Sequence, residues 1–174
     1  MANLKGKKIL MVVAPKKFRD EELMDPLAIF TSSGAEVTIA SKGVDRATGM
    51  FGAEIKVDTD LADVSSEDYN AVIFVGGSGA DVYFNDPGAH ALATNAFNEG
   101  KVVAAICIAP STLANAGLLK GKKATSFSSQ KRNLVKMGAD YTGAAVERDG
   151  RIITGNGPAA AREFGSEVAS AIES

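Results

Sequence analysis

The chain has 174 residues, 45% of them hydrophobic, which is enough to bury one full core. Lysine and arginine number 19 against 21 acidic residues, so the net charge of −2 provides no global basic field for nucleic acid or anionic lipid. One cysteine and one histidine exclude an internal disulfide and a zinc site built from these residue types. We expect one domain, residues 1–174, whose partner is a small molecule or another protein.

The N-terminal apolar run is short. Only residues 9–14 are continuously apolar between basic residues. A secretory signal needs a longer apolar stretch, and a membrane span needs about 20 apolar residues. We therefore expect a cytoplasmic protein without a membrane segment.

Patterns rich in valine and isoleucine alternate with helical patterns along nearly the whole chain. The expected strands cover residues 7–14, 35–41, 70–77, 101–107 and 121–127. The expected helices cover residues 19–34, 86–101, 109–117, 129–138 and 158–174. This alternation is typical of a parallel sheet covered by helices on both faces.

Turn and cap residues refine these boundaries. Residues 49–60 combine glycines with alternating apolar and polar residues, which indicates a short hairpin, and Asp149-Gly150 predicts a second hairpin within 144–155. Pro87 is typical of the first turn of a helix. A serine N-cap is expected for the helix over 129–138.

Cys107 follows the apolar residues 102–106 at the point where a helical pattern begins. Because free cysteine is among the most buried residue types, this position alone favours a core residue. Open α/β sheets, however, bind ligands at the carboxyl ends of their strands. On such a turn the free N–H groups of the next helix favour a thiolate, so we expect a lowered pKa for Cys107. The N–H of Ile108 and one from the glycine turn at 76–77 would form an oxyanion hole.

Five segments resemble one known family in the same order. The stretch "AICIAPSTLANAGLLKGKKATSF" is similar to the nucleophile-elbow segment of the PfpI/ThiJ family, also called the DJ-one superfamily. The other four segments are "FRDEELMDPLAIFTSSGAEVTIAS", "ATGMFGAEIKVD", "AVIFVGG" and "VERDGRIITGNGPAAAREF". The resemblance implies a class I glutamine amidotransferase-like fold, which is a flavodoxin-like three-layer αβα sandwich with a mostly parallel sheet and a cysteine elbow.

The resemblance also implies roles for individual residues. Glu22 matches the family's acid that approaches the cysteine sulfur, and Glu21 is the alternative if the register differs by one. Position alone would instead assign Asp20 to Glu22 to the stabilisation of a helix N-terminus. Gly77 N–H would be the second oxyanion donor beside that of Ile108. A carboxyl group held against a thiolate would have a raised pKa and stay protonated.

Other positions receive weaker assignments. Gly76, Phe127 and Gly155 are candidate substrate-pocket residues, although Gly76 also suits a plain turn and Gly155 a plain helix entry. Asp81 is interpreted as a solvated loop acid and His90 as a surface or packing residue. Ser111 and Thr112 are expected to pack or cap locally. No metal ligand set is apparent.

The protease-type branch of the family carries a histidine directly after its cysteine, where this chain has Ile108. The resemblance therefore implies glutathione-independent glyoxalase or deglycase chemistry through Cys107 and Glu22, with no cofactor and a small aldehyde or glycated substrate. A redox-sensing stress protein or chaperone is the alternative. An intracellular peptidase or amidase is disfavoured, because no imidazole is available as a base. A nucleotide-binding role would rest on the fold type alone. Family members form homo-oligomers, so a dimer or larger ring is expected.

Overall fold

The computed structural model describes residues 1–174 and contains twelve strands and five α-helices. The strands are β1 Lys8–Val12, β2 Lys16–Phe18, β3 Glu36–Ser41, β4 Arg46–Gly49, β5 Glu54–Lys56, β6 Thr59–Asp60, β7 Ala71–Phe74, β8 Val102–Ile106, β9 Lys123–Ala124, β10 Asp140–Tyr141, β11 Val146–Asp149 and β12 Ile152–Gly155. The helices are α1 Asp20–Ser32, α2 Pro87–Asn98, α3 Pro110–Asn115, α4 Lys131–Lys136 and α5 Ala161–Glu173. Short 3₁₀ turns are η1 Leu61–Asp63, η2 Ser66–Asp68, η3 Ser78–Tyr83, η4 Ser128–Gln130 and η5 Pro158–Ala160.

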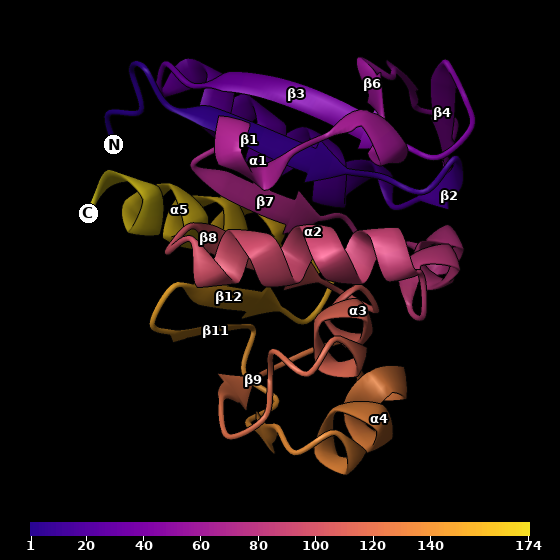
Figure 1. The fold of residues 1–174 in the computed structure, drawn as a ribbon, viewed down its shortest axis with the longest axis vertical. Helices are drawn as coiled ribbons and strands as arrows, with labels where there is room; N and C mark the ends of the chain where they lie inside the picture. The colour runs from indigo at the N-terminus through magenta and orange to yellow at the C-terminus, as the bar shows by residue number, and fades with distance from the viewer.

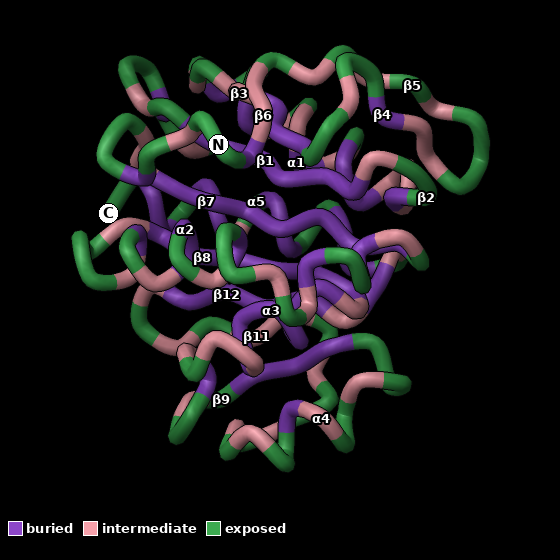
Figure 2. Tube along the Cα trace, turned by 45° about the vertical axis from the view of Figure 1, so that its right-hand side comes forward, coloured by how far each residue is buried: buried purple, intermediate pink, exposed green.

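Seven strands form the central sheet in the order β11-β12-β8-β7-β1-β3-β6 (Figure 1). All neighbouring pairs are parallel except β11 and β12, which form an antiparallel hairpin at one edge. Every residue of β7 and β8 is buried, and Figure 2 shows these central strands buried along their length. Strands covered on both faces need continuous apolar runs, which is the pattern seen in the sequence. The predicted mostly parallel sheet is confirmed.

Helices cover both faces of the sheet. α1 and α5 pack against each other on one face, where their buried residues include Phe30, Phe164, Val168 and Ile172. α2, α3 and α4 contribute to a separate apolar cluster on the other face, and α2 crosses the front of the sheet in Figure 1. Each fully buried large apolar side chain contributes roughly 1.5–3 kcal/mol relative to exposure. The predicted three-layer sandwich is confirmed.

Two smaller sheets lie beside the central one. β4 and β5 pair antiparallel and β2 joins β4, so the hairpin expected within 49–60 is confirmed, although its first strand begins earlier, at Arg46. β9 pairs only with β10, so the strand expected over 121–127 is wrong in its length. The N–H of Thr125 donates to the Thr154 hydroxyl at 3.0 Å instead of continuing a backbone ladder, which ends the strand.

Helix starts follow the sequence signals at α2 and depart from them at α4. Pro87 is the first residue of α2, and the Asp86 carboxylate accepts a hydrogen bond from an N–H of the first turn at 2.9 Å. The serine cap expected for 129–138 is wrong. α4 begins at Lys131 directly after the turn η4, and its N-cap Gln130 makes no side-chain capping bond.

The hairpin expected within 144–155 forms the antiparallel edge of the sheet. Asp149 belongs to β11 and pairs with Ile152, so the two-residue loop is Gly150–Arg151 and lies one residue later than Asp149-Gly150. Gly150 has a φ of 62°, a left-handed conformation that glycine adopts without strain.

The two chain ends meet at the edge of the sheet where the parallel strands begin (Figure 1). The backbone N–H of Asn3 donates to the Glu173 carboxylate at 2.6 Å. Because β1, β7 and β8 all run away from this edge, their carboxyl ends lie together at the opposite one.

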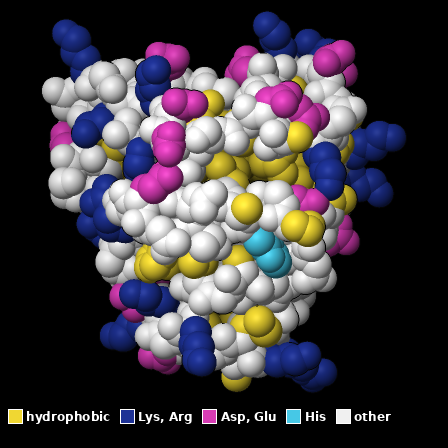
Figure 3. All heavy atoms as spheres, viewed as in Figure 1, with side chains coloured by type: hydrophobic (Ala, Val, Ile, Leu, Met, Phe, Trp, Pro, Cys, Tyr) yellow, Lys and Arg dark blue, Asp and Glu magenta, His cyan; other side chains and the backbone are white.

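The surface in Figure 3 carries lysine and arginine side chains interspersed with acidic ones, mainly around its rim. This mixture agrees with the net charge of −2. No helix combines the length and the apolar character needed to cross a bilayer.

Candidate active site

Cys107 directly follows β8 and turns the chain sharply. Its φ of 66° lies in the left-handed region, which costs a non-glycine residue on the order of 1–3 kcal/mol. Backbone hydrogen bonds hold this conformation, since Cys107 N–H donates to Gly155 O at 2.9 Å and Phe127 N–H donates to Cys107 O at 2.7 Å. α3 follows after two residues, which gives the strand, strained turn and helix of a nucleophile elbow.

Glu22 lies in the first turn of α1 and is completely buried. Neither of its carboxyl oxygens has a hydrogen-bond donor from an N–H or O–H group, and the polar group that faces them is the Cys107 thiol. Gly76 closes the site from the turn that follows β7. A Cβ atom at Gly76 would overlap both Glu22 Oε1 and Cys107 Cβ, so only glycine allows the acid and the cysteine to meet here.

Burial raises the pKa of Glu22 to about 8. The neighbouring Cys107 thiol and the charge of Arg19 lower the pKa of Glu22, but they offset only part of the burial cost. Because this pKa lies above neutrality, the Glu22 carboxyl is mostly protonated at pH 7. This agrees with the protonated acid expected at this position.

Burial also raises the pKa of Cys107, to about 12, and the charge of an ionised Glu22 adds to this effect. The N–H groups of Gly77 and Ile108 lower the pKa of the thiol but do not outweigh burial. The expectation of a lowered thiol pKa is therefore wrong. The helix end supplies donors as expected, but only 8% of Cys107 is exposed, and loss of water outweighs the donors.

Glu22 and Cys107 share one buried space, so their protons leave as those of a coupled pair. The pKa near 12 includes repulsion by an ionised Glu22, and it therefore describes loss of the second proton. After the first proton leaves, a charge on sulfur has two N–H donors, from Gly77 and Ile108, whereas a charge on Glu22 has none. We infer that these donors allow the singly ionised pair to place its charge on the sulfur and its proton on the carboxyl, and that this form is the nucleophilic one.

Gly77 must be glycine for reasons of space and conformation. Its φ is 108°, and a Cβ atom there would overlap the backbone of the segment before α1. Its N–H and that of Ile108 both face the sulfur. Two donors in this arrangement can also stabilise a negatively charged oxygen on a carbon that is bonded to the sulfur. The oxyanion-hole assignment stays a prediction.

The remaining pocket candidates lie at different places around the elbow. Phe127 is 45% exposed and lines an open depression of about 460 Å³ together with Lys131 and Tyr141, but Cys107 does not line it. Gly155 is buried behind the elbow, where a Cβ atom would press on Ile106, so it contributes to packing and not to a pocket wall.

The other acids and the histidine lie away from the sulfur. Glu21 is at the surface and forms an ion pair with Arg19 at 2.9 Å, so Glu22 is the acid that meets the cysteine. Asp81 is exposed in η3. His90 belongs to α2, which covers the opposite face of the sheet from α1. Its ring Nε2 lies 2.8 Å from the Phe84 carbonyl oxygen.

Two polar residues of α3 are buried next to the elbow. The Ser111 hydroxyl donates to Gln130 Oε1 at 2.7 Å, which agrees with a packing role. The Thr112 hydroxyl has no hydrogen-bond partner. No group of three or more His, Cys, Asp or Glu side chains is arranged to hold a metal ion.

Arg19, which no sequence motif marks as a site residue, lies beside the pair. Its charge acts on both Glu22 and Cys107, and its guanidinium carbon lies 4.6 Å from the centre of the Phe51 ring. The one available signal was a basic residue immediately before three acids. Its contact with Phe51, which comes from a distant loop, could not be read from the sequence.

The fold and the elbow define a class of α/β proteins with a sharp turn between a central strand and a short helix. The model of the DJ-1/PfpI family matches residues 7–171, and the chain belongs to this family. An uncharacterised protein of Methanocaldococcus jannaschii is 45% identical over 98% of this chain and 85% of its own length. A deglycase of Pyrococcus horikoshii is 34% identical over 87% of this chain and 91% of its own. The crystal structure of a ThiJ/PfpI domain protein from Brachyspira murdochii superposes with a TM-score of 0.94 at 28% identity, covering 97% of each chain.

Proposed function

We propose that the protein is a cysteine-dependent enzyme that converts 2-oxoaldehydes to 2-hydroxy acids without glutathione, by glyoxalase or deglycase chemistry. One observation carries the proposal: a completely buried carboxyl group without an N–H or O–H partner faces the sulfur of the elbow cysteine. Such a carboxyl can hold and move a proton at the sulfur, which is what this reaction requires. The deglycase name of one relative supports the same chemistry.

In the first step the Cys107 thiolate adds to the aldehyde carbon. A C–S bond forms, the electron pair of the C=O bond moves to oxygen, and that oxygen takes the proton of Glu22 to give a hemithioacetal. The N–H groups of Gly77 and Ile108 stabilise the negative charge as it develops on the oxygen.

In the second step Glu22, now a carboxylate, removes the hydrogen of the former aldehyde carbon as a proton. The electron pair left behind forms a C=C bond with the neighbouring carbonyl carbon, whose oxygen takes a proton from water, and the intermediate is an enediol. Glu22 returns its proton to that neighbouring carbon, and the hydroxyl on the sulfur-bearing carbon gives its proton back to water and becomes the thioester carbonyl. Water then cleaves the C–S bond, so the sum is one water added to the 2-oxoaldehyde, with no external oxidant or reductant.

Lactate formation from methylglyoxal tests this function. Purified protein without glutathione is expected to form lactate, measured with D- and L-specific lactate dehydrogenases. Cys107→Ala and Glu22→Gln are each expected to lower kcat/KM by about a hundredfold or more. Glu36→Gln, which removes an exposed acid at the start of β3, is the matched control. Lactate formation that survives Cys107→Ala would reject this site.

A second candidate function is redox sensing, and the unpartnered Glu22 carboxyl favours it too. Two equivalents of peroxide convert the Cys107 thiolate to a sulfinate and release two waters, and the proton of Glu22 can then bond to a sulfinate oxygen. Mass spectrometry after mild peroxide treatment is expected to show two added oxygen atoms at Cys107. No modification at this residue would eliminate the candidate.

Peptidase or amidase activity is disfavoured. Ile108 occupies the position after the cysteine, and His90, the only histidine, belongs to the helix on the other face of the sheet. Without an imidazole near the sulfur, a leaving amine has no ready proton donor of that type. Casein and small amide substrates are therefore expected to remain intact.

A further inference from the structure

The backbone of Arg19 is packed against the glycine turn of the active site. Its N–H donates to the Gly76 carbonyl at 2.9 Å. A Cβ atom at Gly77 would overlap the Arg19 nitrogen, so the two segments are in direct contact. Gly76 contacts both Glu22 and Cys107, so the backbone of Arg19 lies one residue contact away from this pair.

The guanidinium of Arg19 is held on two sides and open on a third. Its Nε–H and one Nη2–H group both donate to a single oxygen of Glu21, at 3.0 and 2.9 Å. A guanidinium has five N–H donors, so three have no protein partner, and the side chain is 28% exposed. The Phe51 ring lies under its carbon at 4.6 Å, an arrangement that favours the cation.

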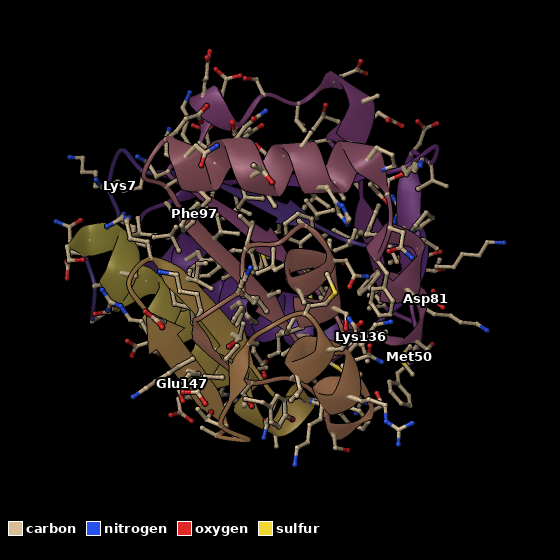
Figure 4. All side chains as sticks on the ribbon, turned by 60° about the horizontal axis from the view of Figure 1, so that its bottom comes forward. Lys7, Met50, Asp81, Phe97, Lys136 and Glu147 are labelled. Carbon is tan, nitrogen blue, oxygen red and sulfur yellow. The ribbon has the colours of Figure 1, made fainter.

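The loop that carries Phe51 is fixed in place. The Asp20 carboxylate accepts hydrogen bonds from Phe51 N–H at 3.2 Å and from Ala53 N–H at 3.0 Å. The sulfur of Met50 accepts one from Ser78 N–H, just after the glycine turn, at 3.5 Å. Figure 4 shows Met50 and Asp81 on the same side of the molecule, opposite Lys7. The loop therefore keeps the Arg19 guanidinium in one position beside the glycine turn at 76–77.

We propose that Arg19 is a specificity-determining residue, whose free guanidinium donors bind a carboxylate on the molecule that Cys107 attacks. The substrates that Arg19 would select are 2-oxoaldehydes or glycated compounds that carry an acidic group, and this substrate class rests on the proposed function. A planar guanidinium with adjacent free donors matches the two oxygens of a carboxylate. The cation also offsets the repulsion between an anionic substrate and the thiolate.

The other charged groups near this border do not offer the same geometry. Lys16 and Lys17 are exposed and border a separate depression with Asp81. Glu21 already holds one edge of the guanidinium and competes for it. Asp20 is engaged with the loop backbone. Arg19 is therefore the cation placed to read a substrate carboxylate at the sulfur.

Alkylation of Cys107 tests the proposal without requiring turnover. Iodoacetate and iodoacetamide react with the same sulfur and differ in charge, and the chain has no other cysteine. The ratio of their second-order rate constants, measured by intact mass at one pH, cancels changes in the nucleophilicity of the sulfur. The full chain is used in every arm, and thermal unfolding confirms that each variant is folded.

Arg19→Gln is expected to lower the iodoacetate to iodoacetamide ratio by about tenfold, the effect of losing a charge-assisted hydrogen-bonded contact. Arg19→Met is a second variant that keeps an apolar stem over the ring if the glutamine variant does not fold. Glu21→Gln frees the guanidinium and is expected to raise the ratio. Lys16→Gln is the control and is expected to leave it within about twofold, because exposed charges are screened by salt.

An unchanged ratio in Arg19→Gln would overturn the proposal, as would an equal fall in Lys16→Gln, which would indicate a diffuse field. Turnover separates the two hypotheses. If the parent protein forms neither lactate from methylglyoxal nor a 2-hydroxy acid from a 2-oxoaldehyde that carries a carboxylate, but the ratio depends on Arg19, the proposed reaction fails and the anion recognition stands. If methylglyoxal is converted and the ratio does not depend on Arg19, the reverse holds.

Discussion

Replacing the buried acid by its amide, Glu22→Gln, should remove a pH dependence from the stability of the protein. The pKa of Glu22 is about 8 in the folded protein, against 4.5 for the ordinary side chain. The folded state therefore holds a proton that the unfolded chain loses above about pH 4.5. Because the folded state binds more protons, the free energy of unfolding falls as the pH rises from about 4.5 to 8.

The size of the effect follows from the pKa difference. Each pKa unit corresponds to about 1.4 kcal/mol, so the loss over this range is a few kcal/mol and at most about 5 kcal/mol. Such a change is a large fraction of the stability of a domain of this size, which is about 5–15 kcal/mol. The glutamine variant carries no proton to lose and should not show this fall.

Urea unfolding between pH 5 and 8 measures the difference directly. The parent protein should lose stability relative to Glu22→Gln as the pH rises, whereas Glu36→Gln should run parallel to the parent. Other titrating groups are common to parent and variant, so they cancel in the comparison. If the free energies of unfolding of the parent and Glu22→Gln change in parallel with pH, Glu22 is not a buried, protonated acid. The proposed mechanism would then lack its proton donor.

Three further predictions use the same site. The rate of Cys107 alkylation by iodoacetamide should rise with pH through a midpoint near 8, where the pair loses its first proton. Glu22→Gln should move that midpoint upward, because burial raises the pKa of a lone thiol. Equal midpoints in the parent and the variant would contradict the shared proton. Gly76→Ala should destabilise the fold by roughly 1–3 kcal/mol and reduce lactate formation, because its methyl group would overlap the reactive pair. Gly88→Ala in the first turn of α2 is its control, and urea midpoints as high as the parent's in Gly76→Ala would count against the packing argument. At a φ of 66°, Cys107→Gly should be about 1 kcal/mol more stable than Cys107→Ala, the reverse of the usual order, and thermal unfolding decides between them.

The elbow could be predicted because its signals are local. A continuous apolar run marks β8, and the small residues after Cys107 begin a helix, so the cysteine is placed at a strand end by sequence alone. Glu22 is different. An acid in the first turn of a helix is normally solvated, and its burial here depends on Gly76, which lies in the turn after β7. The family resemblance identified the acid, whereas composition and spacing did not.

The ionisation of the cysteine could not be predicted from local signals. The helix end and its N–H donors are visible in the sequence and favour the thiolate, but the loss of water around Cys107 depends on the whole fold. The length predicted for the strand at 121–127 was wrong for a related reason. Short strands persist only where a partner strand is available, and beyond Ala124 the N–H of Thr125 goes to a side chain.

The meeting of the two chain ends through Asn3 and Glu173 has a practical consequence. They lie at the amino edge of the parallel strands, and Glu22 and Cys107 lie beyond the carboxyl edge. An affinity tag or a fused reporter attached at either terminus would extend away from this candidate site. A short linker between the termini would also permit circular permutation, with the new opening placed in the Gly150 loop, so that the elbow stays inside one uninterrupted polypeptide segment.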